Sequence, residues 1–225
     1  FVFCKEVEND NEKNENGEVK KTKELSLKES FKLLGKNQYL LIIVALMLLT
    51  FFVNNLSAAT NYYFKYIVGD LGLQSIIGMT SLITVPALVL FPVLSRKIGT
   101  TKIMQGALAI GVIGLVIRTV GGTNHVTLMI GAIFTGIGTM PISMMINTYL
   151  IDCMDYGEWK TGTRIEGLVA SIANFSSKVG QGIALGAVGF IMGLAGYNGM
   201  LEKQSAVVNG TIVFLYNILP LILYV

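Results

Sequence analysis

A single lysine lies deep inside an apolar segment of this sequence. Lys178 stands in SIANFSSKVGQGIALGAVGF, 14 residues beyond Arg164, and a helix would place it about 21 Å from that arginine. In a bilayer, a charge at such depth costs about 2.5–3.5 kcal/mol on insertion scales, so it is expected to face a bundle interior or a water-filled cavity. The other apolar segments offer no acid at this depth. The alternative is a lysine whose long side chain reaches the membrane surface.

Lys178 belongs to a polar stripe with helical spacing. The stripe has five members, separated by 7, 3, 4 and 3 residues: Arg164, Ser171, Asn174, Lys178 and Gln181. This spacing places them on one face of an otherwise apolar helix. Hydroxyl, amide and ammonium groups in a row suit the many hydroxyls of a sugar. Hydrogen bonds between packed helices explain the same stripe equally well.

Two other apolar segments carry isolated polar residues. Asn54 and Asn61 share a helical face near the N-terminal end of the chain's apolar part, and Ser143 and Asn147 follow Met140-Pro141. A proline inside a helix is expected to break or kink it and to free backbone groups near a cavity. These four side chains are therefore site candidates, although packing alone could account for them.

Aromatic and small residues predict how the helices sit in a membrane. Tyr62, Tyr63 and Tyr66 form a cluster of the kind that anchors helix ends at the headgroup level. Glycines in segments 126–151 and 165–194 would let neighbouring helices approach closely.

The stretch DCMDYGEWKTGTR, residues 152–164, is unusually polar for this chain. Three acids, Asp152, Asp155 and Glu158, precede Lys160 and Arg164. The spacing does not fit a calcium loop, and no nucleophile or metal-ligand set accompanies the acids. Taken alone, the stretch is interpreted as a solvated connector in which the acids are balanced by nearby basic residues. With two cysteines and one histidine in 225 residues, no metal site or cofactor is predicted.

Composition indicates an integral membrane protein. The chain is 52% hydrophobic and 14% charged, against about 25% charged in soluble domains. Six apolar stretches approach or exceed the roughly 20 residues that span a bilayer: residues 39–62, 73–94, 103–120, 126–151, 165–194 and 206–225. Because lipid requires internally satisfied backbone groups, the predicted fold is all-α, a polytopic bundle of six transmembrane helices over residues 37–225. The polar residues 1–36 are predicted to form a cytoplasmic loop, with residues 1–4 as the tail of a preceding helix.

The distribution of basic residues predicts the orientation. Most lie on one side of the predicted bundle: Lys5, Lys13, Lys20, Lys21, Lys23, Lys28, Lys32, Lys36, Arg96, Lys97, Lys102, Lys160 and Arg164. The opposite side carries Lys65, Arg118 and Lys203. The positive-inside rule then places the N-terminal loop and the C-terminus in the cytoplasm. The net charge of +3 is read as a topology signal, and no nucleic-acid partner is expected.

The polar connector and the lysine helix together resemble a known family. The pattern D-x-x-D-Y-G-E-W-K-T-G-x-R-x-E-G, followed by S-x-x-x-F-x-x-K-x-G, begins at Asp152 and ends at Gly180. It closely resembles the signature of the glycoside–pentoside–hexuronide:cation symporters, a sugar-transporting branch of the major facilitator superfamily. The resemblance covers residues from about 30 to the end and corresponds to the second six-helix half of a twelve-helix transporter.

The resemblance implies uptake of a sugar, glycoside or hexuronide across the cell membrane, driven by Na+ or H+, with Li+ possible. Two bundles would rock around a site at the membrane midplane, and the cation-binding acids would lie mainly on the absent N-terminal half. Lys178 would face the site and Asn174 would lie near bound sugar. The full candidate set facing substrate or cation is Lys178, Asn174, Ser171, Asn147, Ser143, Asn54 and Asn61. The implied cytoplasmic gate comprises Asp152, Asp155, Tyr156, Glu158, Arg164 and Glu166.

One departure and several alternatives accompany this prediction. A galactoside-transporting family member has a sugar-stacking aromatic residue at the point matched by Ser143, which puts a galactoside preference in doubt. A lysophospholipid-type carrier of the same superfamily would need a more apolar cavity. A half-length, non-transporting membrane subunit is a further alternative. A membrane enzyme is not predicted, because no acids or nucleophiles cluster at one depth.

Overall fold

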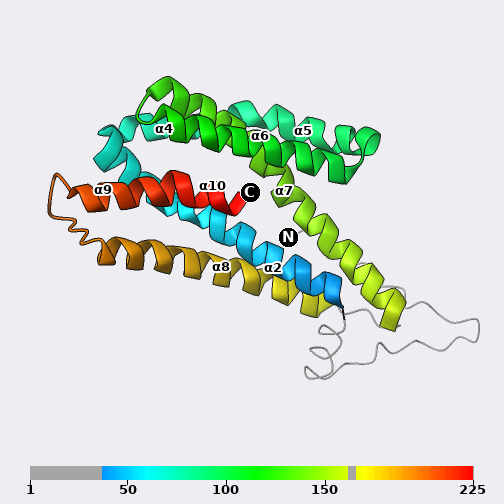
Figure 1. The fold of residues 1–225 in the computed structure, drawn as a ribbon. Coiled ribbons are helices and arrows are strands. Elements are labelled where there is room, and N and C mark those ends of the chain that lie inside the picture. Colours follow the sequence, from blue (N-terminus) through cyan, green and yellow to red (C-terminus); the bar gives the residue numbers. More distant parts are fainter. Residues whose placement is uncertain (1–36, 162–165, 225) are drawn as a thin grey trace, which may run out of the picture. The chain divides into compact units, whose positions relative to one another are not determined.

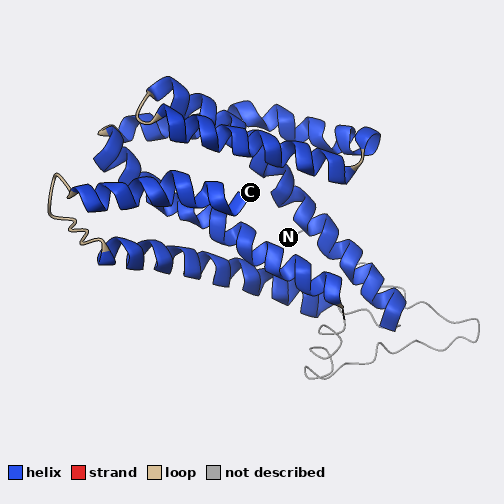
Figure 2. Cartoon of the chain, in the orientation of Figure 1, coloured by secondary structure: helices blue, strands red, loops and turns tan. Residues whose placement is uncertain are grey.

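The computed structural model describes residues 37–161 and 166–224. Every regular element in these two ranges is a helix (Figure 2). The chain divides into two compact units, Phe1–Lys36 and Asn37–Val225. The first unit, with the predicted cytoplasmic loop and the predicted helix tail at 1–4, lies outside the described residues. The helices of the second unit are α2 (Gln38–Asn55), η1 (Leu56–Ala58), α3 (Ala59–Tyr62), η2 (Tyr63–Val68), α4 (Leu71–Met79), α5 (Ser81–Ile98), α6 (Thr100–Gly121), α7 (His125–Thr161), α8 (Glu166–Leu194), α9 (Ala206–Val213), η3 (Phe214–Ile218) and α10 (Leu219–Tyr224).

Five of the described helical segments are long and apolar enough to cross a membrane: Gln38–Val68, Thr100–Gly121, His125–Lys160, Val169–Leu194 and Ala206–Tyr224. A sixth is a pair, Leu71–Ala87 and Val89–Ile98, bent by 41°. Pro92 contributes to this bend, because a proline cannot donate to the carbonyl four residues earlier. The predicted all-helical class is therefore confirmed, and the six predicted apolar segments are helical wherever they are described, except at Thr80 between α4 and α5.

The connections alternate between the two ends of this bundle (Figure 1). One end holds the start of α2, the turn between α5 and α6, the end of α7 and the start of α8. The other holds residues 69–70, the turn from α6 to α7 and the connection from α8 to α9. Lys160 lies at the first end and Lys203 at the second. The first end is called the basic end below, because Arg96, Lys97 and Lys102 flank its α5–α6 turn.

The helices pair in a way that suggests an internal repeat. If α2, α4–α5 and α6 form one triplet and α7, α8 and α9–α10 another, the first element of each triplet packs against the second of the other: α2 against α8, and α7 against α5. Such reciprocal pairing is expected of inverted-topology repeats, which build transporter bundles around a pseudo-two-fold axis.

The closest helix contact joins α6 and α7 through glycine. A Cβ added at Gly114 would lie 2.5 Å from the backbone nitrogen of Thr135, and one at Gly138 would lie 2.6 Å from the carbonyl oxygen of Ala107. On α8, a Cβ at Gly180 would lie 2.9 Å from the carbonyl oxygen of Leu48 in α2. The predicted close approach holds at Gly138 and Gly180, and Gly114 adds a position that was not predicted. In contrast, Gly186 faces open space.

The structure corrects two expectations for α7. Residues 152–161 were expected in a connector, but they form the last turns of this helix. Its 37 residues measure about 55 Å, well beyond the roughly 30 Å of a bilayer core. Helix α7 also continues across Pro141 without the break that the sequence suggested.

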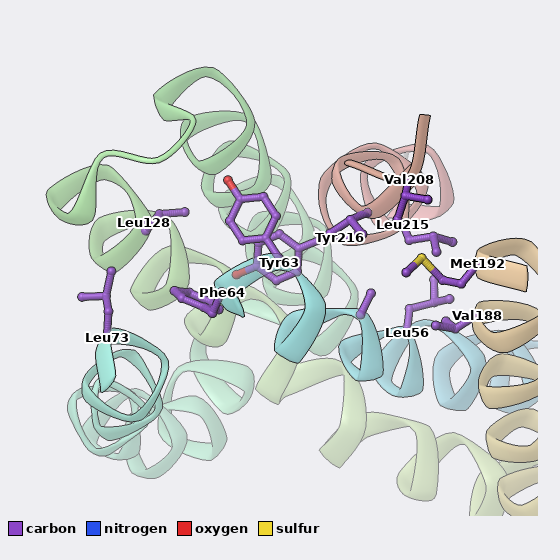
Figure 3. Packing of buried hydrophobic residues seen from close by; sticks show 12 residues of the cluster. Leu56, Tyr63, Phe64, Leu73, Leu128, Val188, Met192, Val208, Leu215 and Tyr216 are labelled. Atoms are coloured by element: carbon purple, nitrogen blue, oxygen red, sulfur yellow. The ribbon is translucent and has the colours of Figure 1, made fainter. Parts of the chain in front are cut away.

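A buried aromatic cluster holds the helices together near the other end. Figure 3 shows Tyr63 and Tyr216 side by side, and their rings stack with centroids 4.2 Å apart. The Tyr63 hydroxyl donates a hydrogen bond to the carbonyl oxygen of Gly122 at 2.9 Å. Tyr63 is 1% exposed, so its expected role as a surface anchor is wrong. Burial among Phe64 and other apolar side chains makes it part of the core.

Tyr62 and Tyr66 differ from Tyr63, because both are half-buried and meet Tyr197 in the connection between α8 and α9. The Tyr62 and Tyr197 rings meet edge to face at 5.1 Å, and the Tyr66 and Tyr197 hydroxyls are 3.1 Å apart. That hydrogen bond, followed by burial, raises the pKa of Tyr197 to about 12, as expected if Tyr197 is the donor.

Arg118 also joins two helical segments at this end of the bundle. It was expected at the far end of segment 103–120; it lies in the last turn of α6 and points to the last membrane-spanning segment. Its Nε donates to Asn217 Oδ1 at 2.9 Å, its Nη2 donates to the Tyr216 carbonyl oxygen at 2.5 Å, and its guanidinium carbon lies 4.0 Å from the Tyr216 ring centroid. No acidic side chain in the described ranges pairs with it. Arg118 therefore ties α6 to η3 through neutral acceptors and one ring.

Candidate functional site

The polar stripe of α8 lies on a face that turns away from its own bundle. Ser171, Asn174 and Lys178 are exposed, whereas Ser176 and Gly180 on the same helix are buried. Gly180 packs on α2, so the stripe points away from that contact. The predicted shared face of the three polar residues is present in the structure.

Lys178 has no ion-pair partner among the described residues. Its helix is one of the candidate membrane spans, and it lies 12 residues beyond the start of α8 at Glu166, or about 18 Å along the axis. An exposed ammonium at that depth is costly against lipid. The stripe is therefore suited to a water-filled cavity or to a polar partner surface.

Ser143 and Asn147 of α7 line an open hollow of about 470 Å³, together with Thr139, Met140 and Met144. Both polar side chains are exposed. The Ser143 hydroxyl has only a long contact of 3.5 Å to the Thr139 carbonyl oxygen. Its hydroxyl is thus weakly engaged within the helix and faces the hollow.

Asn54 joins this region from α2. A second hollow, of about 210 Å³, is lined by Asn54, Ser143 and Thr139 among mostly apolar side chains. The structure thus brings together two candidates that are 89 residues apart in sequence.

The Asn61 side chain lies at a different hollow from that of Asn54. It lines a hollow of about 470 Å³ that contains no atom of Asn54, so the two asparagines do not serve one cavity. The 3₁₀ segment η1 lies between them, and its tighter turn rotates the positions that follow it. Gln74 of α4 lies at the same hollow and donates to Asn61 Oδ1 at 2.6 Å. The sequence analysis did not select Gln74, although its side chain is the only side-chain amide in the apolar segment 73–94.

At the basic end, the three acids of the stretch 152–164 belong to the last turns of α7. Asp152 and Asp155 are exposed and Glu158 is half-buried. The Tyr156 ring meets Tyr39 of α2 edge to face at 5.1 Å, and the Lys160 ammonium lies 5.8 Å from the Tyr156 centroid. The acids therefore sit on a helical extension that contacts the start of α2.

Asn37 fixes this contact. Its Oδ1 accepts from the backbone N–H of Leu40, which caps α2, while its Nδ2 donates to the Cys153 carbonyl oxygen at 2.9 Å. Asn37 is 6% exposed, and a Cβ at Gly157 would lie 3.0 Å from its Nδ2. Of the other gate candidates, Arg164 lies outside the described residues and Glu166 is described only as the first residue of α8.

The described residues contain no group of three potential metal ligands. Asp70 is the only acid between Gln38 and Ile151, and it caps α4 by accepting from the Leu73 N–H at 3.1 Å. Among the candidate site residues, the described spans thus supply amides, hydroxyls and Lys178, which bind polar neutral solutes by hydrogen bonds.

These features define a multi-pass membrane protein whose polar face turns away from its own bundle. A family model described as MFS/sugar transport protein matches residues 1–225, and the chain belongs to this family. The predicted resemblance to the glycoside–pentoside–hexuronide symporters is confirmed, and the transport family agrees with the prediction of a non-enzyme.

Three curated relatives illustrate the similarity. The chain is 33% identical to an isoprimeverose transporter of Lactiplantibacillus pentosus, over 80% of the chain and 38% of that protein. It is 29% identical to a raffinose carrier protein of Pediococcus pentosaceus, over 93% of the chain and 32% of that protein. It is 28% identical to a lactose permease of Lactobacillus delbrueckii subsp. bulgaricus, over 84% of the chain and 30% of that protein. The chain therefore matches less than two fifths of the length of each.

Proposed function

We propose that this chain is the C-terminal half of a secondary transporter that takes up a sugar or glycoside together with Na+ or H+. The observation that carries the proposal is the exposed stripe of Ser171, Asn174 and Lys178 on a membrane-spanning helix, turned away from α2. A polar face of this kind is stable only against water, substrate or a polar partner. The relatives named for isoprimeverose, raffinose and lactose support a sugar as the solute.

The substrate would bind between this bundle and the N-terminal half. Lys178 and Asn174 on α8 and Ser143 and Asn147 on α7 offer donors and acceptors to sugar hydroxyls, and each neutral hydrogen bond contributes about 0.5–1.5 kcal/mol. The open hollow beside Ser143 leaves room for a ring against Met140 and Met144.

The coupling cation requires ligands from outside the described spans. Na+, H+ or Li+ coupling usually depends on carboxylates near the midplane, and the segments 38–69 and 71–151 contain none. We therefore assign the coupling acids to the N-terminal half, and we assign to Lys178 the task of facing them across the cavity.

The extension of α7 would act as the cytoplasmic gate. Asp152, Asp155 and Glu158 stand beyond the bilayer core on a rigid helix, with Tyr156 packed between them and α2. Ion pairs at a wet surface are worth about 0–1 kcal/mol each, so a handful of them, with Arg164 and Glu166, can close a state without locking it. We propose on the same grounds that the basic end, the N-terminal loop and the C-terminus face the cytoplasm, as the positive-inside rule predicts.

Uptake by cells tests the proposal. The chain is expressed with the half that it is proposed to follow, in cells without sugar carriers, and uptake of labelled lactose, raffinose and isoprimeverose is followed with and without a Na+ or H+ gradient. Lys178→Ala should abolish gradient-driven uptake at normal surface expression. Lys203→Ala, a loop lysine on the opposite side, serves as the matched control and should leave uptake unchanged.

Two results would contradict the proposal. Gradient-driven uptake that survives Lys178→Ala would remove the role given to Lys178. Failure of the wild-type protein to move any of the three sugars, despite correct insertion, would favour the half-length subunit or the lipid-carrier alternative.

A further inference from the structure

We propose that the side-chain amides of Asn61 and Gln74 form an outer subsite that binds neighbouring hydroxyls of a sugar before the sugar reaches Lys178. The inference rests on the proposed transport function, but it concerns a different place in the molecule. Asn61 comes from α3 and Gln74 from α4, on the two sides of the connection at residues 69–70.

The two amides form one unit. Gln74 Nε2 donates to Asn61 Oδ1 at 2.6 Å; Asn61 is exposed and Gln74 is half-buried. This bond leaves the Asn61 amide donors and the Gln74 carbonyl acceptor without another bond to the described residues. A donor and an acceptor held side by side match the two roles of a hydroxyl pair on adjacent sugar carbons.

The cavity around the pair has the composition of a ligand site. Its volume of about 470 Å³ lies within the range of about 300–1,000 Å³ common for small-molecule pockets, which combine apolar walls with a few polar groups. Asn55, Ser57 and Thr60 add polar atoms, and Ile77 and Leu185 provide apolar surface for the C–H face of a sugar ring.

The backbone of the first span is irregular at this cavity. The 3₁₀ segment η1 precedes Asn61, and the π-helical segment η2 follows it. Short 3₁₀ and π segments inside long helices often mark functional sites, because they reorient side chains and loosen backbone hydrogen bonds. In this span they turn Ser57, Thr60 and Asn61 toward the cavity.

The position along the membrane fits an entry subsite. Gln74 lies three residues from the start of α4, about 5 Å from the end opposite the basic end. Leu185, which lines the cavity, lies seven residues beyond Lys178 on the same exposed face of α8, a separation of about 10 Å. A sugar released from the amide pair therefore has a short path along α8 to the lysine.

The competing explanation is that the hydrogen bond between Asn61 and Gln74 only joins α3 to α4. This purely structural role is called the clip below. A clip would affect stability and would not distinguish sugars by their hydroxyls. A subsite would affect the concentration dependence of uptake from outside and would respond to removal of a single hydroxyl from the substrate.

The test uses the complete transporter and whichever of lactose, raffinose and isoprimeverose the wild type takes up. Gln74→Met keeps the side-chain length and removes both polar atoms, and Asn61→Leu does the same for its partner. Gln105→Met, at an exposed glutamine of α6, is the matched control. Initial rates give KM and Vmax for uptake, and a set of monodeoxy analogues of the same sugar is compared with it.

The expected result is a rise in KM of about 3- to 10-fold in either variant, the equivalent of one or two lost neutral hydrogen bonds. Vmax and melting temperature should stay near the wild-type values. At least one monodeoxy analogue should be a poorer substrate than the parent for wild type, and this difference should shrink in Gln74→Met but not in Gln105→Met.

Unchanged KM in both variants, or a lower melting temperature with an unchanged KM and unchanged analogue preference, would overturn the subsite and leave the clip. These outcomes require that wild type transports the sugar, so they are separate from a failure of the proposed function, in which wild type transports none. If Gln74→Met does not reach the membrane, Asn61→Leu and Gln74→Ala give the same comparison.

Discussion

Arg118 and Lys178 are both cations on apolar helices, but the structure gives them opposite surroundings. Lys178 is exposed on α8. Arg118 is half-buried and uses its Nε and Nη2 on Asn217 and Tyr216. The sequence could identify Lys178, because its depth follows from the apolar residues around it. It could not place Arg118, because its partners are 98 and 99 residues away and only the packing of α6 against the last span brings them together.

At the scale of this residue, we predict that Arg118→Lys destabilises the protein. A lysine keeps the charge but cannot present two forked donors or stack on Tyr216, so one of the two acceptors loses its partner. The cost of such a loss is about 1–3 kcal/mol, which should lower the apparent melting temperature in detergent. Arg96→Lys, at an exposed arginine, is the control. Equal melting temperatures for both variants would contradict the inference that Arg118 joins α6 to η3.

At the scale of elements, α7 shows where local sequence patterns stop being informative. The six apolar segments were recognisable from length and composition, and apart from the turn at Thr80 their described residues are helical. The acidic stretch after Ile151 suggested a connector, since it is charged and contains Gly157. Asn37, the N-cap of α2, contacts Cys153, and Tyr39 of α2 contacts Tyr156. We infer that these contacts hold the stretch as helix, since long-range contacts can override local preference.

Asn37 provides a prediction for this element. Asn37→Ser keeps the cap of α2 but is too short to reach the Cys153 carbonyl oxygen, so the extension of α7 should move more freely against α2. In a Cys4→Ser background, the buried Cys153 thiol should then react faster with a small maleimide. Asn37→Ala should show the same increase and, in addition, lose about 1 kcal/mol of stability with the cap.

Asn124→Ser is the matched control, because Asn124 accepts from the Val126 N–H at the opposite end of α7. An unchanged rate of Cys153 labelling in Asn37→Ser would show that the Asn37 contact does not hold the extension, and the gate would need another source of rigidity.

At the scale of the whole bundle, the distribution of polar atoms separates two kinds of exposed surface. The exposed face of α8 carries Ser171, Asn174 and Lys178, while that of α6 carries Ile113, Val116 and Val120. Neither face is covered by other described helices. The reciprocal packing of α2 with α8 and of α7 with α5 explains why both faces are available, and side-chain chemistry then assigns one to water and the other to lipid.

This assignment predicts which positions water-soluble reagents reach. In a chain with both native cysteines replaced by serine, Lys178→Cys and Asn174→Cys should be modified by a charged thiosulfonate, because thiolates form only where water has access. Ile113→Cys, at an exposed position of the apolar α6 face that we assign to lipid, should react far more slowly. Transported sugar should protect the two α8 positions and leave Ile113→Cys unaffected. Equal labelling of α6 and α8 would mean that the polar stripe does not line an aqueous cavity, and the transport mechanism proposed for Lys178 would lose its physical basis.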